Sequence, residues 1–254
     1  MRARIAWAIA SIGVVALFVL FWKIIADARI LSPAFFPGPD RTWKAFIHAA
    51  ASGDLAPRIY ATVWRMLIGW LLASIAGILL GALIGSSGRL RRLLGPTLEF
   101  LRPLPASATI PIFIVLLGLS DAMVLSVVAF GALWPMLLGT VHGFQTVEPR
   151  LYEVARVLHL SRASVIFKIA LPSALPDILS GLRLSLTVAL ILTVVCEMLI
   201  GVDGLGSWTL ISARAFRSAD LYVGVILLGL VGYVGASALS VVSDRLLVWK
   251  LRKT

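Results

Sequence analysis

The sequence of 254 residues contains little charge, and this scarcity excludes an ordinary soluble domain. Only 14% of its residues are Asp, Glu, Lys or Arg, whereas a soluble domain carries about 25%. Hydrophobic residues make up 60% of the chain, and its mean hydropathy is +0.99. This composition indicates a polytopic membrane protein.

Residues that would bind metals or nucleotides are also scarce. The single cysteine, Cys196, allows no intramolecular disulfide and no multi-cysteine metal site. The spacing of His48, His142 and His159 brings no two of them together as metal ligands. The sequence has no G-x-x-x-x-G-K-[S/T] motif, and no Ser/His/Asp set or carboxylate pair is apparent. We therefore expect no enzyme, no metal site and no cofactor bound by this chain.

Long apolar runs, by contrast, are abundant. A helix needs about 20 mostly apolar residues to cross the hydrocarbon layer. Five runs are free of charge, and a sixth contains only Asp177, Arg183 and Glu197. The six are Ile5–Trp22, Met66–Ser87, Pro103–Ser120, Ala122–Val141, Ala174–Ile200 and Leu221–Ser243. None alternates with the period of 2 that is typical of barrel strands. We predict an all-α integral membrane protein with about six transmembrane helices.

The distribution of Lys and Arg predicts that both termini face the cytoplasm. Cytoplasmic loops are enriched in these residues. With the amino terminus inside, the inner segments hold thirteen of them and the outer segments six, which six Asp balance. The first apolar run is long for a secretory signal and lacks a small-residue cleavage site, so we interpret it as a retained span.

The outer segment between the first two spans is predicted to contain a short helix. "SPAFFPGPD" is a Pro/Gly-rich turn region, after which Asp40 can cap the helix "RTWKAFIHAAA". Its residues Trp43, Phe46, Ile47 and Ala50 share a face. That face can lie on the outer membrane surface or pack on the bundle. We accordingly divide the chain into residues 1–61 and a five-helix core, residues 62–254.

A cytoplasmic loop at about 145–172 looks like a small folded unit. Pro149 suits the first turn of a helix, Ser161 can cap a second one, and Pro172 is expected to end it. The first helix has an apolar face and a charged face, formed by Leu151, Val154, Ala155 and Leu158 and by Arg150, Glu153 and Arg156. Such faces can pack on the bundle, lie on lipid or bind another protein.

Several ordered motifs carry a resemblance to a known family. Glu153-x-Ala155, followed by Ile169-x-Leu171-Pro172, resembles the EAA loop of ATP-binding-cassette importer permeases. Four further segments resemble nitrate/sulfonate/taurine-type permeases in order and spacing: "RRLLGPTLEFLRPLP", "ALPDILSGLRLSL", "VVCEML" and "GLGSWTLISARAFRSADLYVGVI". The resemblance extends from about Thr62 to the end of the chain.

The resemblance implies a type I importer permease in the inner membrane and assigns roles to residues of the loop. In the family this loop is a coupling helix that docks into the ATPase subunit; here it would use Glu153, Val154, Ala155, Arg156, His159, Leu171 and Pro172. The family works as a homodimer with two ATPase subunits, which bind ATP and Mg, and a solute-binding protein. Its substrates include sulfonates, taurine and nitrate.

Two positions in the loop depart from the family pattern. Val154 replaces the second alanine of the EAA triplet, and His159 replaces the usual glycine between the two short helices. Glycine adopts a left-handed backbone without steric cost. Histidine tolerates that region more often than most residues, so we expect the turn to form.

Ionisable residues within the spans are candidates for the translocation path or its gate. Glu197 lies near the outer end of the fifth span, whereas Arg102 and Arg183 lie near inner helix ends, where they can also snorkel to the interface. Glu197 can alternatively be a structural hydrogen-bonding residue. An ion-coupled secondary transporter would use Glu197 for protons, and in a membrane scaffold Glu197 and Arg102 would be dispensable. Neither alternative explains the 145–172 loop.

Small residues recur every four positions along the second span, at Gly69, Ala73, Gly77, Gly81 and Gly85. Such a stripe allows two helices to approach closely. The sequence leaves open whether the partner helix belongs to the same chain or to a second copy.

Overall fold

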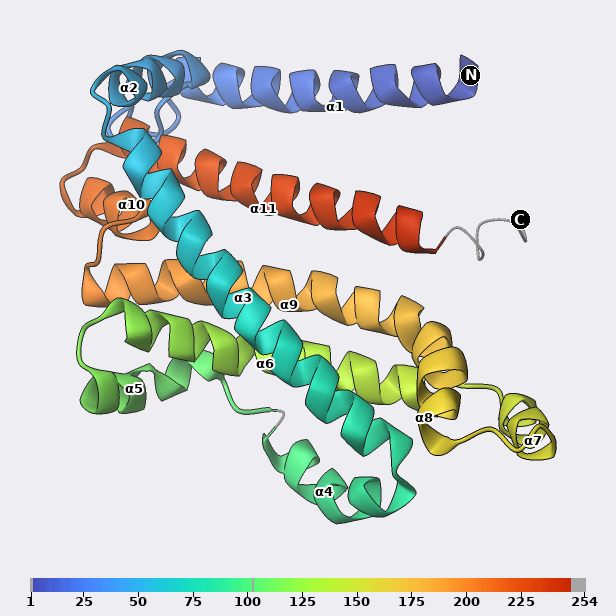
Figure 1. Ribbon diagram of the computed structural model, residues 1–254. Helices are drawn as coiled ribbons and strands as arrows, with labels where there is room; N and C mark the ends of the chain where they lie inside the picture. The colour runs from blue at the N-terminus through green and yellow to red at the C-terminus, as the bar shows by residue number, and fades with distance from the viewer. Residues whose placement is uncertain (1, 102, 248–254) are drawn as a thin grey trace.

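The structure is a computed structural model that describes residues 2–101 and 103–247 (Figure 1). Its described residues form helices and no strand. The long helices are α1 (Arg2–Asp27), α3 (Leu55–Ser86), α6 (Asp121–Gln145), α9 (Leu171–Ile200) and α11 (Ser218–Leu246). The short ones are α2 (Pro39–Ala51), α4 (Gly88–Leu101), α5 (Ile110–Leu117), α7 (Pro149–Val157), α8 (Arg162–Val165) and α10 (Leu205–Arg214). The prediction of an all-α protein is confirmed.

Five of these helices are long and apolar enough to cross a membrane. A sixth span arises if α4 and the segment Ala106–Leu117, which are bent by 83° relative to each other, are counted together. The prediction of one helix over Pro103–Ser120 is therefore wrong in detail. Pro105 is extended, with ψ 114°, Ala106–Thr109 form a 3₁₀ turn, and Gly118 ends α5 at φ 68°. Proline cannot donate the backbone hydrogen bond that a continuous helix would need there.

The core consists of α3, α6 and α9: α6 packs extensively against both α3 and α9, and α3 crosses α9 (Figure 1). The small-residue stripe of α3 faces α6. A methyl group on Gly81 would stand 2.5 Å from Thr140 Cβ, and one on Gly77 would stand 2.8 Å from Met136 Cβ. Both separations are shorter than van der Waals contact, so only glycine permits this approach. The stripe is an internal contact of one chain.

Helix α2 packs on its own bundle. Thr42 is buried, and Ala45, Phe46 and Ala49 contact the apolar cluster built around Leu205 and Val223. The expected apolar face is therefore rotated, because Trp43 and Ile47 are exposed. The predicted cap is also corrected: Gly38 is the N-cap, and Asp40 lies in the first turn, where its carboxylate pairs with Lys23 of α1.

The bundle has two distinct ends, which we name the α10 end and the α7 end. Helices α2, α5 and α10 lie at the first, and α7 and α8 lie at the second (Figure 1). The start of α1 and the end of α11 also lie at the α7 end. Within the described residues, α1 and α11 thus each have one end beside the 145–172 loop, on one side of the bundle. That this side is the cytoplasm stays a prediction.

Candidate functional site

The α7–α8 loop at the α7 end has the local structure that its sequence predicts. Pro149 occupies the first turn of α7, and the helix ends in a left-handed residue, His159, at φ 49°. The Leu160 N–H donates to the Ala155 carbonyl at 3.0 Å, and the His159 N–H donates to the Arg156 carbonyl at 3.1 Å. This pair of bonds is the Schellman motif that glycine usually terminates. The expectation that the turn forms with histidine is confirmed.

The second helix of the loop begins as expected but does not end at Pro172. Ser161 caps α8, because its side-chain oxygen accepts from the Ser164 N–H at 3.2 Å. The chain then passes through a π-helical turn, Ile166–Ala170, directly into α9. Pro172 lies in the first turn of α9, where its missing N–H is tolerated. The prediction of a helix end at Pro172 is wrong, and Arg162–Ile200 is one continuous helical segment.

One side of the loop is anchored to the bundle. Ala155 is 3% exposed, and the half-buried Tyr152 and Leu171 pack against the cluster that contains Phe144 and Ala174. The same partial burial raises the pKa of the Tyr152 phenol, because the charged form would lose its hydration. The loop is therefore held in a fixed position rather than hanging from the bundle.

The other side of the loop is apolar and exposed. Val154 is 53% exposed, Val157 78% and Leu158 62%. Glu153, Arg156, His159 and Pro172 are exposed beside them. The structure thus divides the expected apolar face: Ala155 turns to the bundle, and the larger side chains turn away from it. An exposed apolar patch flanked by charges is typical of a protein interface.

At the α10 end, an ionic cluster centred on Arg65 of α3, which the sequence analysis overlooked, joins three helices and the α9–α10 turn. Its Nε donates to Asp121 Oδ1 at 2.7 Å, and its Nη1 donates to Glu197 Oε1 at 3.1 Å and to the Asp203 carbonyl at 2.6 Å. These partners come from the start of α6, the end of α9 and the α9–α10 turn. Arg65 is 7% exposed and Glu197 is fully buried.

Glu197 receives two further hydrogen bonds. The Thr62 hydroxyl lies 2.9 Å from both carboxylate oxygens, and the Gly206 N–H donates to Oε2 at 2.9 Å. Thr62 also accepts from the Leu205 N–H at 2.9 Å. A side chain at Gly204 would collide with the Glu197 carboxylate. Residues 201–204 connect α9 to α10, and this connection together with the first turn of α10 encloses the Glu197 carboxylate.

We name this set of residues the outer clamp: Thr62, Arg65, Asp121, Glu197, Asp203 and Gly206. Every oxygen of Glu197 is occupied by a donor of the same chain, so the carboxylate has a structural environment. One signal in the sequence could have revealed the clamp. Arg65 borders the uncharged run 66–87 at the same predicted depth as Glu197, and opposite charges at one depth within a membrane usually pair.

The other two charged candidates lie apart from the clamp. Arg183 is exposed, and it precedes Glu197 by fourteen positions in α9, which places the two about 21 Å apart along the helix. Arg102 lies outside the described residues. The structure therefore does not join Arg183 and Glu197 into one site. Across the described ranges, no three His, Cys, Asp or Glu side chains lie close enough to hold a metal ion.

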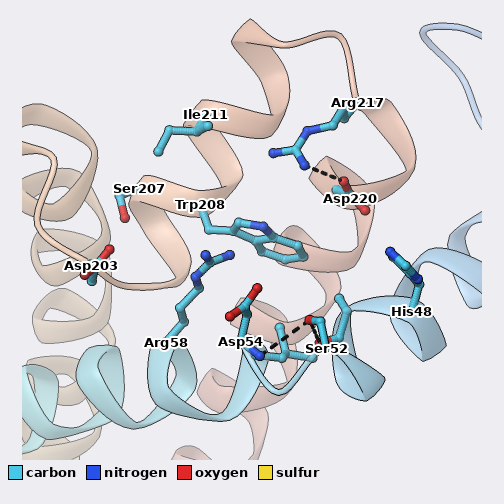
Figure 2. A pocket seen from close by; sticks show the side chains of 12 residues that line it. His48, Ser52, Asp54, Arg58, Asp203, Ser207, Trp208, Ile211, Arg217 and Asp220 are labelled. Atoms are coloured by element: carbon cyan, nitrogen blue, oxygen red, sulfur yellow. Dashed lines mark hydrogen bonds and ion pairs between the residues drawn. The ribbon is translucent and has the colours of Figure 1, made fainter.

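A polar cavity of about 250 Å³ opens next to the outer clamp. Figure 2 shows the Arg58 side chain extending beside Trp208, over whose ring its guanidinium carbon lies 5.7 Å from the centroid. Arg217 pairs with Asp220 at 3.5 Å on the opposite wall. The cavity contains both signs of charge and is lined by α2, α3, α10, α11 and their connections. Its lining residues also include His48, Ser52, Asp54, Asp203, Ser207 and Ile211.

Sequence comparisons identify relatives that match nearly the whole chain. Residues 73–253 match the family described as binding-protein-dependent transport system inner membrane component. A putative aliphatic sulfonates transport permease of Bacillus subtilis is 32% identical over 98% of this chain and 90% of its own length. A nitrate import permease of Synechococcus elongatus is 31% identical, over 92% and 85% of the two chains. A taurine transport system permease of Escherichia coli is 27% identical, over 94% and 89%.

Solved structures of similar fold also belong to transporters. A chain of the methionine transporter MetNI, described as inward facing, has a TM-score of 0.60 and 17% identity, over 74% of this chain and 95% of its own. A chain of an amino acid ABC transporter has a TM-score of 0.62 and 17% identity, over 82% and 97%. At this identity the likeness shows a common fold.

Proposed function

Because the chain belongs to the family of binding-protein-dependent transport system inner membrane components, we propose a complete assembly for it: a homodimer, two ATPase subunits at the α7 end and a solute-binding protein at the α10 end. The chain itself is a membrane-spanning permease subunit of an ATP-driven importer, with the fold of ABC importer permeases. Family membership implies ATPase and solute-binding partners; their stoichiometry and places are the proposal.

The exposed apolar patch on the α7–α8 loop is the observation that best supports the ATPase contact. Val154, Val157 and Leu158 face away from this chain, while Ala155 and Leu171 fix the loop to the core. A patch that is rigidly held and uncovered suits a partner that must transmit force. Glu153 and Arg156 would then set its orientation on the partner through charge.

The continuous helix from Arg162 to Ile200 provides the mechanical link between the two ends. A displacement of the α7–α8 loop would move α8 and α9 together, and the last turn of α9 contains Glu197 of the outer clamp. We propose that ATP binding acts through this helix on the α10 end. ATP and the loaded binding protein must each favour one conformation, since a ligand with equal affinity for both shifts neither.

In this proposal Glu197 holds a gate and does not contact the substrate. Its carboxylate oxygens are occupied by Thr62, Arg65 and Gly206. A bare carboxylate on the path would also repel an anion. The secondary-transporter alternative would need Glu197 to exchange protons, and its closed hydrogen-bond shell offers no support for that role.

The solute-binding protein is proposed to dock over the polar cavity of Figure 2. This cavity presents Arg58, Arg217, Asp54 and Asp220 at the α10 end, away from the proposed ATPase surface. Charges of both signs allow a partner to be oriented by complementary charges. The relatives are named for aliphatic sulfonates, taurine and nitrate, so we propose a small oxyanion-bearing solute as cargo.

Purification from the native membrane in a mild detergent, with mass spectrometry of the bound proteins, tests the assembly. We expect an ATPase subunit in equal amount with the permease. Recovery of the permease alone, before and after cross-linking in the membrane, would contradict the proposal. The Glu153→Arg variant provides the matched comparison: it should retain less ATPase than the wild type while keeping the dimer.

A further inference from the structure

A second cavity, of about 850 Å³, lies at the α7 end between the α3–α4 turn and the α7–α8 loop. Four arginines stand in its wall: Arg89 and Arg92 from α4, Arg156 from α7 and Arg162 from α8. The remaining wall residues are small, polar or apolar: Ser86, Ser87, Gly88, Tyr152, Ala155, Leu160, Val165, Ile166 and Ala170. The cavity therefore concentrates positive charge from three helices.

No carboxylate of the described chain neutralises these arginines. None of the four appears in an ion pair among the described residues, and the wall contains no Asp or Glu. The Arg92 side chain donates from Nε to the Gly88 carbonyl at 3.3 Å. Four guanidinium groups around one space repel one another, and an anion placed between them would remove that repulsion. The planar fork of each guanidinium matches two oxygens of a phosphate.

The apolar surroundings distinguish a lipid from a soluble anion. On the side of α3 turned away from α6, Leu72, Ile75, Leu79 and Leu83 are 50%, 51%, 66% and 57% exposed. Their spacing of three and four residues forms one continuous stripe. The next position of the same stripe is Ser86, which lies in the cavity wall. An apolar track thus leads from the span directly to the cluster of arginines.

We propose that this cavity binds the phosphate headgroup of an anionic phospholipid, whose acyl chains lie along the α3 stripe. Basic pockets between transmembrane helices at the cytoplasmic side suit such headgroups. The proposal goes beyond the transport function and requires that the chain spans a membrane with the α7 end at the predicted cytoplasmic side. The lipid would brace the α3–α4 turn against the α7–α8 loop.

Arginine labelling tests the site directly on the intact protein. The permease is placed in nanodiscs of phosphatidylcholine with or without cardiolipin and treated with phenylglyoxal, and modified arginines are identified by peptide mass spectrometry. We expect cardiolipin to protect Arg89 and Arg92 but not Arg245, an exposed arginine near the end of α11. Equal modification with and without cardiolipin, or equal protection of Arg245, would overturn the proposal.

Native mass spectrometry of the released protein measures lipid retention independently. The double variant Arg89→Gln/Arg92→Gln should bind cardiolipin about twenty-five-fold more weakly, at about five-fold for each arginine. Arg245→Gln should retain it as the wild type does. Both measurements are independent of transport and of ATPase binding. A negative result would therefore contradict the lipid site without contradicting the proposed importer assembly.

Three further outcomes would assign the cavity to another occupant and overturn the lipid proposal. Inorganic phosphate alone could protect Arg89 as well as cardiolipin does, which would identify a soluble-anion site. The ATPase could protect the arginines in the absence of anionic lipid, which would identify a protein interface. A Leu79→Cys variant could form a disulfide with a second copy, which would place the α3 stripe in a dimer contact. Without these outcomes, protection by cardiolipin supports the proposal.

Discussion

Arg65 at the α10 end and three arginines at the α7 end differ in their burial and in their ion pairing. At the α10 end Arg65 is 7% exposed and bonds to Asp121, Glu197 and the Asp203 carbonyl. At the α7 end Arg89, Arg156 and Arg162 are exposed, and within the described chain they form no ion pair. The charge of Arg65 is thus satisfied within the chain, whereas the charges of these three arginines stay available.

The paired Arg65 stabilises the fold, whereas the exposed arginines are available to bind other molecules. A buried charge is stable only when other groups of the same chain pair with it. An exposed charge beside an apolar patch costs the fold little, so it can be kept for binding. Variants at the α10 end should therefore reduce stability, and variants at the α7 end should reduce association.

The largest effect is expected from Arg65→Met. It leaves the Glu197 carboxylate buried without its cation, which typically costs about 3–5 kcal/mol. Denaturant unfolding in detergent measures the loss, and Arg156→Gln, at the exposed end, should change stability by about 0.5 kcal/mol or less. Glu197→Gln in the Arg65→Met background should recover part of the loss. Equal stability of Arg65→Met and Arg156→Gln would remove the contrast between the ends.

The next effect concerns the α3–α6 contact that supports both ends. Gly81→Ala brings a methyl group to 2.5 Å from Thr140 Cβ, and such overpacking costs about 1–3 kcal/mol. The matched control is Gly229→Ala in α11, where a methyl group would meet nothing within 4 Å. The control should be neutral or stabilise the helix by up to about 1 kcal/mol. A thermal unfolding series distinguishes them, and identical shifts would disprove the close approach.

A smaller free-energy change, confined to binding, is expected from charge reversal on the α7–α8 loop. Glu153→Arg together with Val154→Arg should weaken ATPase co-purification about tenfold or more, because the exposed patch becomes charged and repulsive. Both positions are exposed, whereas Ala155 is buried. A substitution at Ala155 would affect folding as well as binding, so it would not isolate the effect on binding. The unfolding midpoint should stay unchanged. Normal solute uptake by a well-expressed double variant would contradict the coupling role.

The smallest effect is expected at His159. Its φ of 49° favours glycine, so His159→Gly should be neutral or stabilise by less than about 1 kcal/mol, whereas His159→Val should destabilise by about 1–2 kcal/mol. Both follow from unfolding midpoints of the purified variants. Equal midpoints for glycine and valine would mean that the turn is not held in the left-handed region.

Local features were predictable because they depend on neighbouring residues. Pro149 starts α7, Ser161 caps α8, and His159 takes the left-handed turn, each by backbone chemistry within a few positions. Of the two failures that follow, the first has a local cause and the second a tertiary one. Pro172 does not end its helix, because the π-helical turn Ile166–Ala170 precedes it. Trp43 and Ile47 are exposed, because α2 contacts the bundle through Thr42.

Composition and hydropathy determined from the sequence alone that this chain is a multi-span helical membrane protein, and ordered motifs indicated its family. These properties are sums over the chain or patterns of a few residues, and they need no knowledge of which helices touch. Only the tertiary structure decided that the glycine stripe of α3 faces α6 of the same chain. It also decided that Arg65 meets Glu197 across 132 residues of sequence. The physical reason is that a buried charge takes whatever partner the packing of distant helices brings to it.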